Sequence, residues 1–306
     1  MAHKIIGFLM AVGKRTLWVI TGCTAVGKTK YAIDFARANN GEIISCDSLL
    51  VYKHMDIGTA KPTTEERELV RHHCVDLVDP SENFDISLFV ETAKNARNSI
   101  ISLGRNVVIV GGSGFYLKSF FYPVVDGIKI PSAVRKFVDE QYKSAGLDGL
   151  VTMLISANDG ICPCIDIRNP RRVAAALGRC LAGGKTFDEI GEDFKATPSP
   201  FADCEKHTIF LEREKEDLEI RVRERAKKMV ADGLIGEVQH LLANYKHLSV
   251  SAACAIGYRE TINWLQHPTT EENLASEIAG NTMKLIKKQK TWLKKQIPID
   301  ERILLR

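Results

Sequence analysis

One glycine-rich motif constrains the fold of this chain more than any other feature, Gly22-Cys23-Thr24-Ala25-Val26-Gly27-Lys28-Thr29. It matches the pattern G-x-x-x-x-G-K-[ST], and it lies between a short apolar run at 17–20 and a helical pattern. In that setting the glycines let the backbone wrap a phosphate, and consecutive N–H groups at a helix N-terminus hold its negative charge. The motif therefore predicts a phosphate-binding loop, or P-loop, at the carboxyl end of a buried strand.

The polar members of the P-loop have expected tasks. Lys28 supplies a mobile cation to the terminal phosphate, and the hydroxyl of Thr29 suits a Mg²⁺ ligand. Kinases, ATPases and GTPases share this motif, so it does not identify the substrate by itself. We expect the diphosphate-binding residues to be Gly22, Thr24, Ala25, Val26, Gly27, Lys28 and Thr29.

The runs that surround the motif predict a doubly wound parallel sheet. Apolar, branched runs at 17–20, 43–46 and 107–110 are typical of parallel strands buried on both faces. Helical patterns at 28–39 and 87–103 lie between them, and a fourth candidate strand, 208–211, comes much later. This alternation predicts an α/β fold with a P-loop NTPase-like parallel sheet flanked by helices.

The long interval before the fourth strand predicts a helical insertion. Its helical patterns, broken by Gly and Pro, cover 132–144, 148–157, 170–182 and 186–193, and later helices are expected at 217–229, 235–244 and 271–296. We therefore predict a P-loop core in two parts, 14–126 and 201–306, with an insertion domain at 127–200. The second part of the core ends in a basic helix.

Composition is that of an ordinary globular protein, with 45% hydrophobic and 26% charged residues. The net charge of +4 is compatible with a polyanionic partner without proving one. Eight cysteines are scattered along the chain, and the pair Cys162 and Cys164 has no further ligands at zinc spacing. We interpret them as free thiols.

No apolar stretch reaches the length of about 18 residues that a membrane span needs. The apolar run at 5–12 leads into Lys14-Arg15 without a convincing cleavage site, and Met10 is an alternative start. A cytoplasmic protein with no membrane contact is expected. Nothing suggests an obligate dimer, so we expect a monomer.

Asp47 is the second candidate for chemistry. It ends the predicted strand 43–46, which we expect beside the P-loop strand, at the edge of the sheet where ligands bind. A metal ligand, a general base and a cap of the next turn are all compatible with this position. The strand at 107–110 carries no terminal carboxylate, unlike the metal-side strand of most ATPases, and ends in Gly111-Gly112-Ser113-Gly114.

Five blocks together resemble the signature segments of tRNA dimethylallyltransferases, also called tRNA isopentenyltransferases. The resemblance extends from about Leu17 to Leu293, and the first two blocks below are together highly specific. The blocks are Asp47-Ser48-Leu49-Leu50-Val51-Tyr52, Gly58-Thr59-Ala60-Lys61-Pro62, Gly111-Gly112-Ser113-Gly114-Phe115-Tyr116-Leu117, Ala255-Ile256-Gly257-Tyr258-Arg259-Glu260 and Lys287-Lys288-Gln289-Lys290-Thr291-Trp292.

The resemblance implies a reaction. The family transfers a dimethylallyl group from dimethylallyl diphosphate to the exocyclic amine of the adenosine just 3′ of the anticodon. The P-loop would then hold the leaving diphosphate, with Lys28 and Mg²⁺ stabilising its developing charge. Asp47 aligns with the family's general base. Ser113 stands where the family usually has Thr, and the hydroxyl is kept.

The resemblance also implies tRNA contacts in both parts of the chain, with the insertion clamping the anticodon arm. The family pattern after Arg171-Arg172 is Arg-Ala-Leu-Glu, whereas this chain has Ala175 and Gly178 in place of the arginine and the glutamate. Trp292 is interpreted as a core or hinge residue. The expected tRNA-binding residues are Asp47, Ser48, Leu49, Leu50, Ser113, Arg135, Arg171, Arg172, Gly257, Tyr258, Arg259, Lys284, Lys287 and Lys288.

Three alternative functions stay open from the residues. A small-molecule P-loop kinase would need ATP and a phosphate acceptor, and the missing late metal-side Asp and the basic helix speak against it. A P-loop protein that binds RNA without catalysis is opposed by intact Lys28, Thr29 and Asp47. A related class prenylates free adenine nucleotides, but the 58–62 block and the basic helix favour tRNA.

Overall fold

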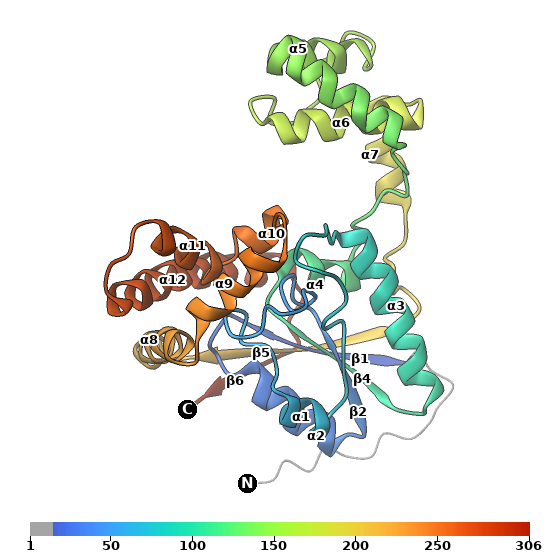
Figure 1. Cartoon of the computed structure of the whole chain (residues 1–306). Helices are drawn as coiled ribbons and strands as arrows, with labels where there is room; N and C mark the ends of the chain where they lie inside the picture. Colours follow the sequence, from blue (N-terminus) through green and yellow to red (C-terminus); the bar gives the residue numbers. More distant parts are fainter. Residues whose placement is uncertain (1–14) are drawn as a thin grey trace. The chain divides into compact units, whose positions relative to one another are not determined.

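The computed structural model describes residues 15–306, and the apolar run at 5–12 with the alternative start Met10 lies outside this range. Within it, six parallel strands form one sheet in the order β3-β2-β4-β1-β5-β6 (Figure 1). The predicted P-loop NTPase-like α/β fold is confirmed. The strands are β1 Thr16–Gly22, β2 Gly41–Ser45, β3 His72–His73, β4 Asn106–Gly111, β5 Glu205–Arg213 and β6 Glu301–Leu305.

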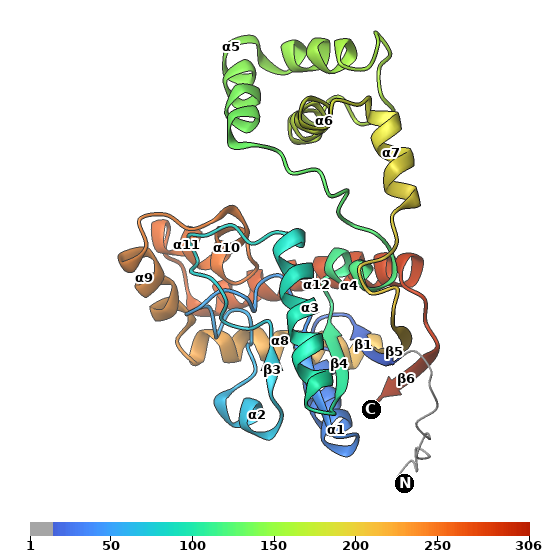
Figure 2. The same ribbon diagram turned by 90° about the vertical axis from the view of Figure 1, so that its right-hand side faces the viewer.

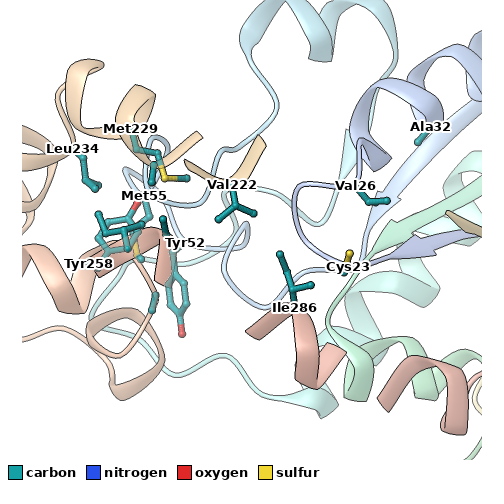
Figure 3. Close-up of a cluster of buried hydrophobic side chains, with 14 of the residues drawn as sticks. Cys23, Val26, Ala32, Tyr52, Met55, Val222, Met229, Leu234, Tyr258 and Ile286 are labelled. Atoms are coloured by element: carbon teal, nitrogen blue, oxygen red, sulfur yellow. The ribbon is translucent and has the colours of Figure 1, made fainter. Parts of the chain in front are cut away.

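The central strands alternate between two hydrophobic layers. On β2, Ile43 packs into the layer formed with α1 (Lys28–Ala38) and α8 (Lys215–Ala231), whereas Ile44 packs into the layer formed with α3 (Ile86–Ser102) and α4 (Gly114–Phe121). Both side chains are buried, because helices cover both faces of the sheet. Figure 3 shows part of the first layer around Val222, Tyr52 and Tyr258.

The four predicted strands all lie in the sheet, but one neighbour relation was wrong. The strand that ends before Asp47, β2, pairs with β4 and β3, so β4 separates it from the P-loop strand β1. Strand order is set by the crossover helices, which the sequence pattern does not specify. The short strand β3 and the edge strand β6 were not predicted.

A side-chain cap fixes the start of α3, and five further helices in the described part of the chain complete the core unit. The Asp85 side chain caps α3 by accepting hydrogen bonds from the backbone N–H groups of Ser87 at 2.9 Å and Leu88 at 3.0 Å. The helices not yet named are α2 Thr64–Leu69, α9 Leu234–Asn244, α10 Val250–Ala253, α11 Tyr258–Gln266 and α12 Glu271–Gln296.

Residues Tyr122–Pro200 form a second compact unit with its own core. It contains α5 (Ser132–Ser156), α6 (Pro170–Gly183) and α7 (Phe187–Ala196), which bury Leu154 and Leu177 among other side chains. The expected break between 144 and 148 appears as a bend in α5 at Gly146, whose φ is 65° (Figure 2).

The core unit comprises the chain up to Phe121 together with Phe201–Arg306. Where the insertion leaves and re-enters it, the rings of Phe120 and Phe201 stack with centroids 4.5 Å apart. The two ends of the insertion are therefore held next to each other by the core itself. No helix within residues 15–306 is long and apolar enough to cross a membrane.

Candidate active site at the carboxyl edge of the sheet

The P-loop occupies the turn from β1 into α1. Gly27 caps α1 with a φ of 106°, a left-handed conformation that disfavours any side chain. The Lys28 ammonium donates hydrogen bonds to the carbonyl oxygens of Gly22 at 3.1 Å and Cys23 at 2.8 Å. Burial lowers the pKa of Lys28 to about 8, while the nearby charges of Cys23 and Asp47 act in the opposite direction.

Asp47 follows β2 and faces the same edge. Its Oδ1 accepts a hydrogen bond from the backbone N–H of Leu49 at 2.9 Å. Burial raises the pKa of Asp47, and the Leu49 hydrogen bond and the positive charges of Lys28 and Arg225 only partly offset this effect. A carboxylate whose pKa is raised in this way is a better proton acceptor than a solvated one.

Ser113 connects the loop after β4 to the loop after β2. Its Oγ accepts a hydrogen bond from the Ser48 backbone N–H at 3.1 Å and lies 3.5 Å from the Ser48 hydroxyl oxygen. The structure thus brings Lys28, Asp47 and Ser113 to adjacent loops on one edge of the sheet. These are the residues for which the sequence predicted catalytic roles.

Two arginines of α8 reach the same edge, and sequence reasoning missed both. Arg221 donates from Nε to the carbonyl oxygen of Ala25 at 3.0 Å, and Arg225 donates to the carbonyl oxygen of Thr59 at 3.3 Å. Burial lowers the pKa of Arg225, and the Asp47 charge opposes this shift. The sequence signal that could have identified them is their spacing of four residues, which places two arginines on the same face of a helix that follows a strand.

Two cavities meet at Asp47. The first, of about 620 Å³, is formed by the P-loop, the 59–63 segment and α8, and the charged side chains of Lys28, Arg221 and Arg225 line it. The second, of about 740 Å³, has a largely apolar wall that includes Leu49, Phe115 and Trp292. The residues that line both cavities are Thr24, Asp47, Thr59 and Arg225.

The backbone at 56–58 is held in place by one carboxylate. Glu237 of α9 accepts hydrogen bonds from the backbone N–H groups of Asp56, Ile57 and Gly58 at 2.9, 2.8 and 3.2 Å, and from the Tyr258 hydroxyl at 2.5 Å. A Cβ at Gly58 would lie 2.4 Å from the Tyr258 ring, so only glycine fits there. This packing explains the specificity of the Gly58–Pro62 block.

The 257–259 residues predicted to bind tRNA separate into two groups. Gly257 and Tyr258 are buried, and the Tyr258 hydroxyl is engaged by Glu237. Arg259 is exposed, lines the larger cavity and pairs with Glu260, whose carboxylate is fully buried. An RNA contact from this segment would therefore come from Arg259.

The other predicted tRNA-binding residues lie in both units. Lys284, Lys287 and Lys288 are exposed on α12, and Lys288 also lines the larger cavity. In the insertion unit, Arg135 is exposed in the first turn of α5, and Arg171 and Arg172 are exposed in the first turn of α6.

The departures from the family pattern in α6 have a partial structural account. Gly178 is buried, and a Cβ there would lie 3.4 Å from the Ile130 side chain, so a glutamate would displace this packing. Ala175 is exposed, and nothing in the structure explains the loss of the arginine.

The fold and this edge define a class, the P-loop α/β enzymes, here with the carboxylate of Asp47 and the phosphate loop lining one cavity. The family model described as IPP transferase matches residues 50–296, and the chain belongs to this family. The P-loop itself precedes the matched range.

Curated relatives and solved structures cover nearly the whole chain. It is 44% identical over 290 residues to the tRNA dimethylallyltransferase of Opitutus terrae, covering 95% of this chain and 93% of that protein. The tRNA isopentenylpyrophosphate transferase of Bacillus halodurans is 31% identical, with a TM-score of 0.67 over 95% of this chain and 90% of that one. A eukaryotic dimethylallyltransferase, described as acting on tRNA, is 25% identical, with a TM-score of 0.79 over 94% of this chain and 74% of that one.

Proposed function

We propose that this chain is a tRNA dimethylallyltransferase. It transfers a dimethylallyl group from dimethylallyl diphosphate to the exocyclic amine of the adenosine 3′-adjacent to the anticodon, and it releases diphosphate. Family membership and the names of the relatives support this reaction. The observation that carries it is the position of Asp47 at the junction of the P-loop cavity, lined by Lys28, Arg221 and Arg225, and a cavity with a largely apolar wall.

In this mechanism the P-loop cavity holds the diphosphate, and the larger cavity holds the dimethylallyl group and the adenine. The exocyclic nitrogen attacks C1 of the dimethylallyl group, the carbon–oxygen bond breaks, and its electron pair leaves with the diphosphate. Asp47 accepts the proton that the amine loses. Lys28, Arg221 and Arg225 stabilise the charge that develops on the leaving oxygens.

Mg²⁺ is part of this proposal. No cluster of three or more His, Cys, Asp or Glu side chains that could hold a metal occurs within residues 15–306, so the protein supplies few ligands. The Thr29 hydroxyl at the start of α1 would be the protein ligand that holds Mg²⁺ there, beside a diphosphate bound in the P-loop cavity. When bound, Mg²⁺ neutralises charge on the diphosphate.

The tRNA substrate follows from the same proposal. The adenine must leave its stack to reach Asp47, since the carboxylate lies inside the cavities and not on an open surface. Exposed Lys284, Lys287, Lys288 and Arg259 suit contacts to phosphates. We place the reaction in the cytoplasm and expect a monomer, which light scattering of the purified chain would test.

The deciding experiment follows labelled dimethylallyl diphosphate into a tRNA that has adenosine 3′ of its anticodon. Asp47→Asn keeps the shape of the side chain but removes the base, so we expect transfer to fall by roughly 10²- to 10⁴-fold. Asp34→Asn, an exposed change on α1, serves as the matched control. Absence of transfer by the folded wild-type chain would refute the proposal.

A further inference from the structure

We propose that Gln289 of α12 is a positioning residue that locks the P-loop to the loop carrying Ser113. The inference rests on the proposed function, because it assigns a task within the same site. Gln289 lines the larger cavity, yet its amide is committed to the backbone of both loops.

The oxygen and the nitrogen of the Gln289 side-chain amide each make a hydrogen bond to a backbone group. Gln289 Oε1 accepts a hydrogen bond from the Thr24 backbone N–H at 2.9 Å, and Nε2 donates one to the Gly112 carbonyl oxygen at 3.1 Å. A carboxylate can only accept and an ammonium can only donate, so neither can make this pair of contacts. The bridge therefore requires an amide at this distance from the helix.

The bridge lies directly beside the lysine of the P-loop. A Cβ on Gly112 would lie 3.0 Å from Gln289 Nε2, 3.1 Å from the Gly22 carbonyl oxygen and 3.4 Å from Lys28 Nζ. The Gly22 oxygen is itself an acceptor for Lys28. Gly112 thus accepts a hydrogen bond from the bridging amide and lies close to the ammonium group of Lys28.

The other end of the same loop reaches the general base. Ser113 follows Gly112 and accepts from the backbone N–H of Ser48, the residue after Asp47. A continuous set of short contacts therefore runs from Thr24 through Gln289 and Gly112 to the Asp47 loop. It fixes the spacing between the leaving-group side and the proton-accepting side of the reaction.

The position of Gln289 on α12 supports a specific purpose. Ile286 and Leu293, three residues before and four after it, are buried, and Leu285 and Trp292 line the same cavity. An apolar side chain would satisfy the packing of this stripe equally well. The amide therefore adds a constraint on the two loops that burial alone does not require.

The test compares Gln289→Met, which keeps the length without either hydrogen bond, with Gln289→Glu, which keeps only the acceptor. We expect Gln289→Met to lower kcat/KM for dimethylallyl diphosphate by about 10- to 100-fold, as for the loss of one or two hydrogen bonds near a charge. tRNA affinity measured without the donor should stay within about twofold, because the contacts lie on the donor side. Thr291→Val is the control, since the Thr291 hydroxyl bonds only to its own helix.

Gln289→Glu gives a readout that a purely structural role would not move. Its carboxylate can still accept from the Thr24 N–H but cannot donate to the Gly112 carbonyl oxygen, so we expect kcat to fall while KM for dimethylallyl diphosphate changes by less than about threefold. Wild-type values for Gln289→Met, an equal loss in Thr291→Val, or an unchanged kcat in folded Gln289→Glu would each overturn the proposal.

Calorimetric binding of inorganic diphosphate separates this inference from the function on which it rests. A wild-type chain that binds diphosphate but transfers no prenyl group would refute the proposed function without refuting the Gln289 bridge. In that case, weaker diphosphate binding by Gln289→Met than by Thr291→Val still supports the bridge, and equal binding refutes it.

Discussion

At the scale of single residues, we expect Lys28 and Asp47 to set the pH range of the proposed reaction. Asp47 accepts a proton only when ionised, and its pKa is raised by burial above the ordinary value of 3.8. Lys28 must stay protonated, and burial lowers its pKa to about 8. We expect kcat/KM to rise through the pKa of Asp47, reach a plateau, and fall above pH 8 or so.

Lys28→Arg tests the assignment of the alkaline limit. Arginine stays charged throughout this range, so the variant should lose the decline above pH 8, although its rate is lower. Initial rates at pH 5 to 10 with saturating tRNA would measure both profiles. A decline that persists unchanged in Lys28→Arg would show that another group titrates there.

Motif residues could be predicted from sequence, whereas residues that act through tertiary contacts could not. Lys28 and Asp47 lie in local patterns whose chemistry is readable without a fold. Arg225 and Gln289 reach the site from helices far along the chain, and their partners are backbone atoms. The amino-acid sequence around Arg225 or Gln289 does not show which backbone atoms of distant segments these side chains will contact.

At the scale of elements, the 56–58 loop depends on Glu237 of α9. Glu237→Ala leaves the N–H groups of Asp56, Ile57 and Gly58 and the Tyr258 hydroxyl without their acceptor. We expect a loss of about 2–3 kcal/mol in the free energy of unfolding, because hydrogen bonds to a charged group are lost while water partly replaces them. Urea unfolding would measure it.

Activity should fall as well, since Gly58 and Thr59 line the cavities that the loop helps to form. Glu277→Ala, an exposed change on α12, is the control. If Glu237→Ala unfolds at the urea concentration of the wild-type chain, the anchoring role is wrong.

The same scale explains which strands were predicted. Strands β1, β2, β4 and β5 have runs of buried residues, and their apolar composition shows in the sequence. Strand β6 is an edge strand with no fully buried residue, and β3 has only two residues, so neither leaves such a pattern. Pairing with β5, supported by the Asp300 carboxylate that accepts from the Thr208 N–H at 2.7 Å, forms β6.

At the scale of the whole molecule, the division into two compact units predicts that the core folds without the insertion. Because Phe120 stacks on Phe201, a Gly/Ser linker of about eight residues, with a reach of roughly 15 Å, should replace 122–200. We expect the shortened chain to unfold cooperatively and to bind diphosphate as the full chain does. Circular dichroism and calorimetry would measure these properties.

Crosslinking to anticodon-loop RNA should fall strongly in the same variant, because the exposed Arg135, Arg171 and Arg172 are removed with the insertion. The full chain with only these arginines changed to alanine is the matched control. Equal crosslinking before and after the deletion would refute the clamping role of the insertion.

The meeting of two cavities at Asp47 has an evolutionary consequence. In the proposed reaction, the P-loop cavity holds the diphosphate whatever group it carries, and the neighbouring cavity holds the carried group. Natural selection could therefore exchange one recognition element and leave the other intact. A loop known from nucleotide chemistry can serve isoprenoid chemistry in this way, with a change of apolar lining in place of a new fold.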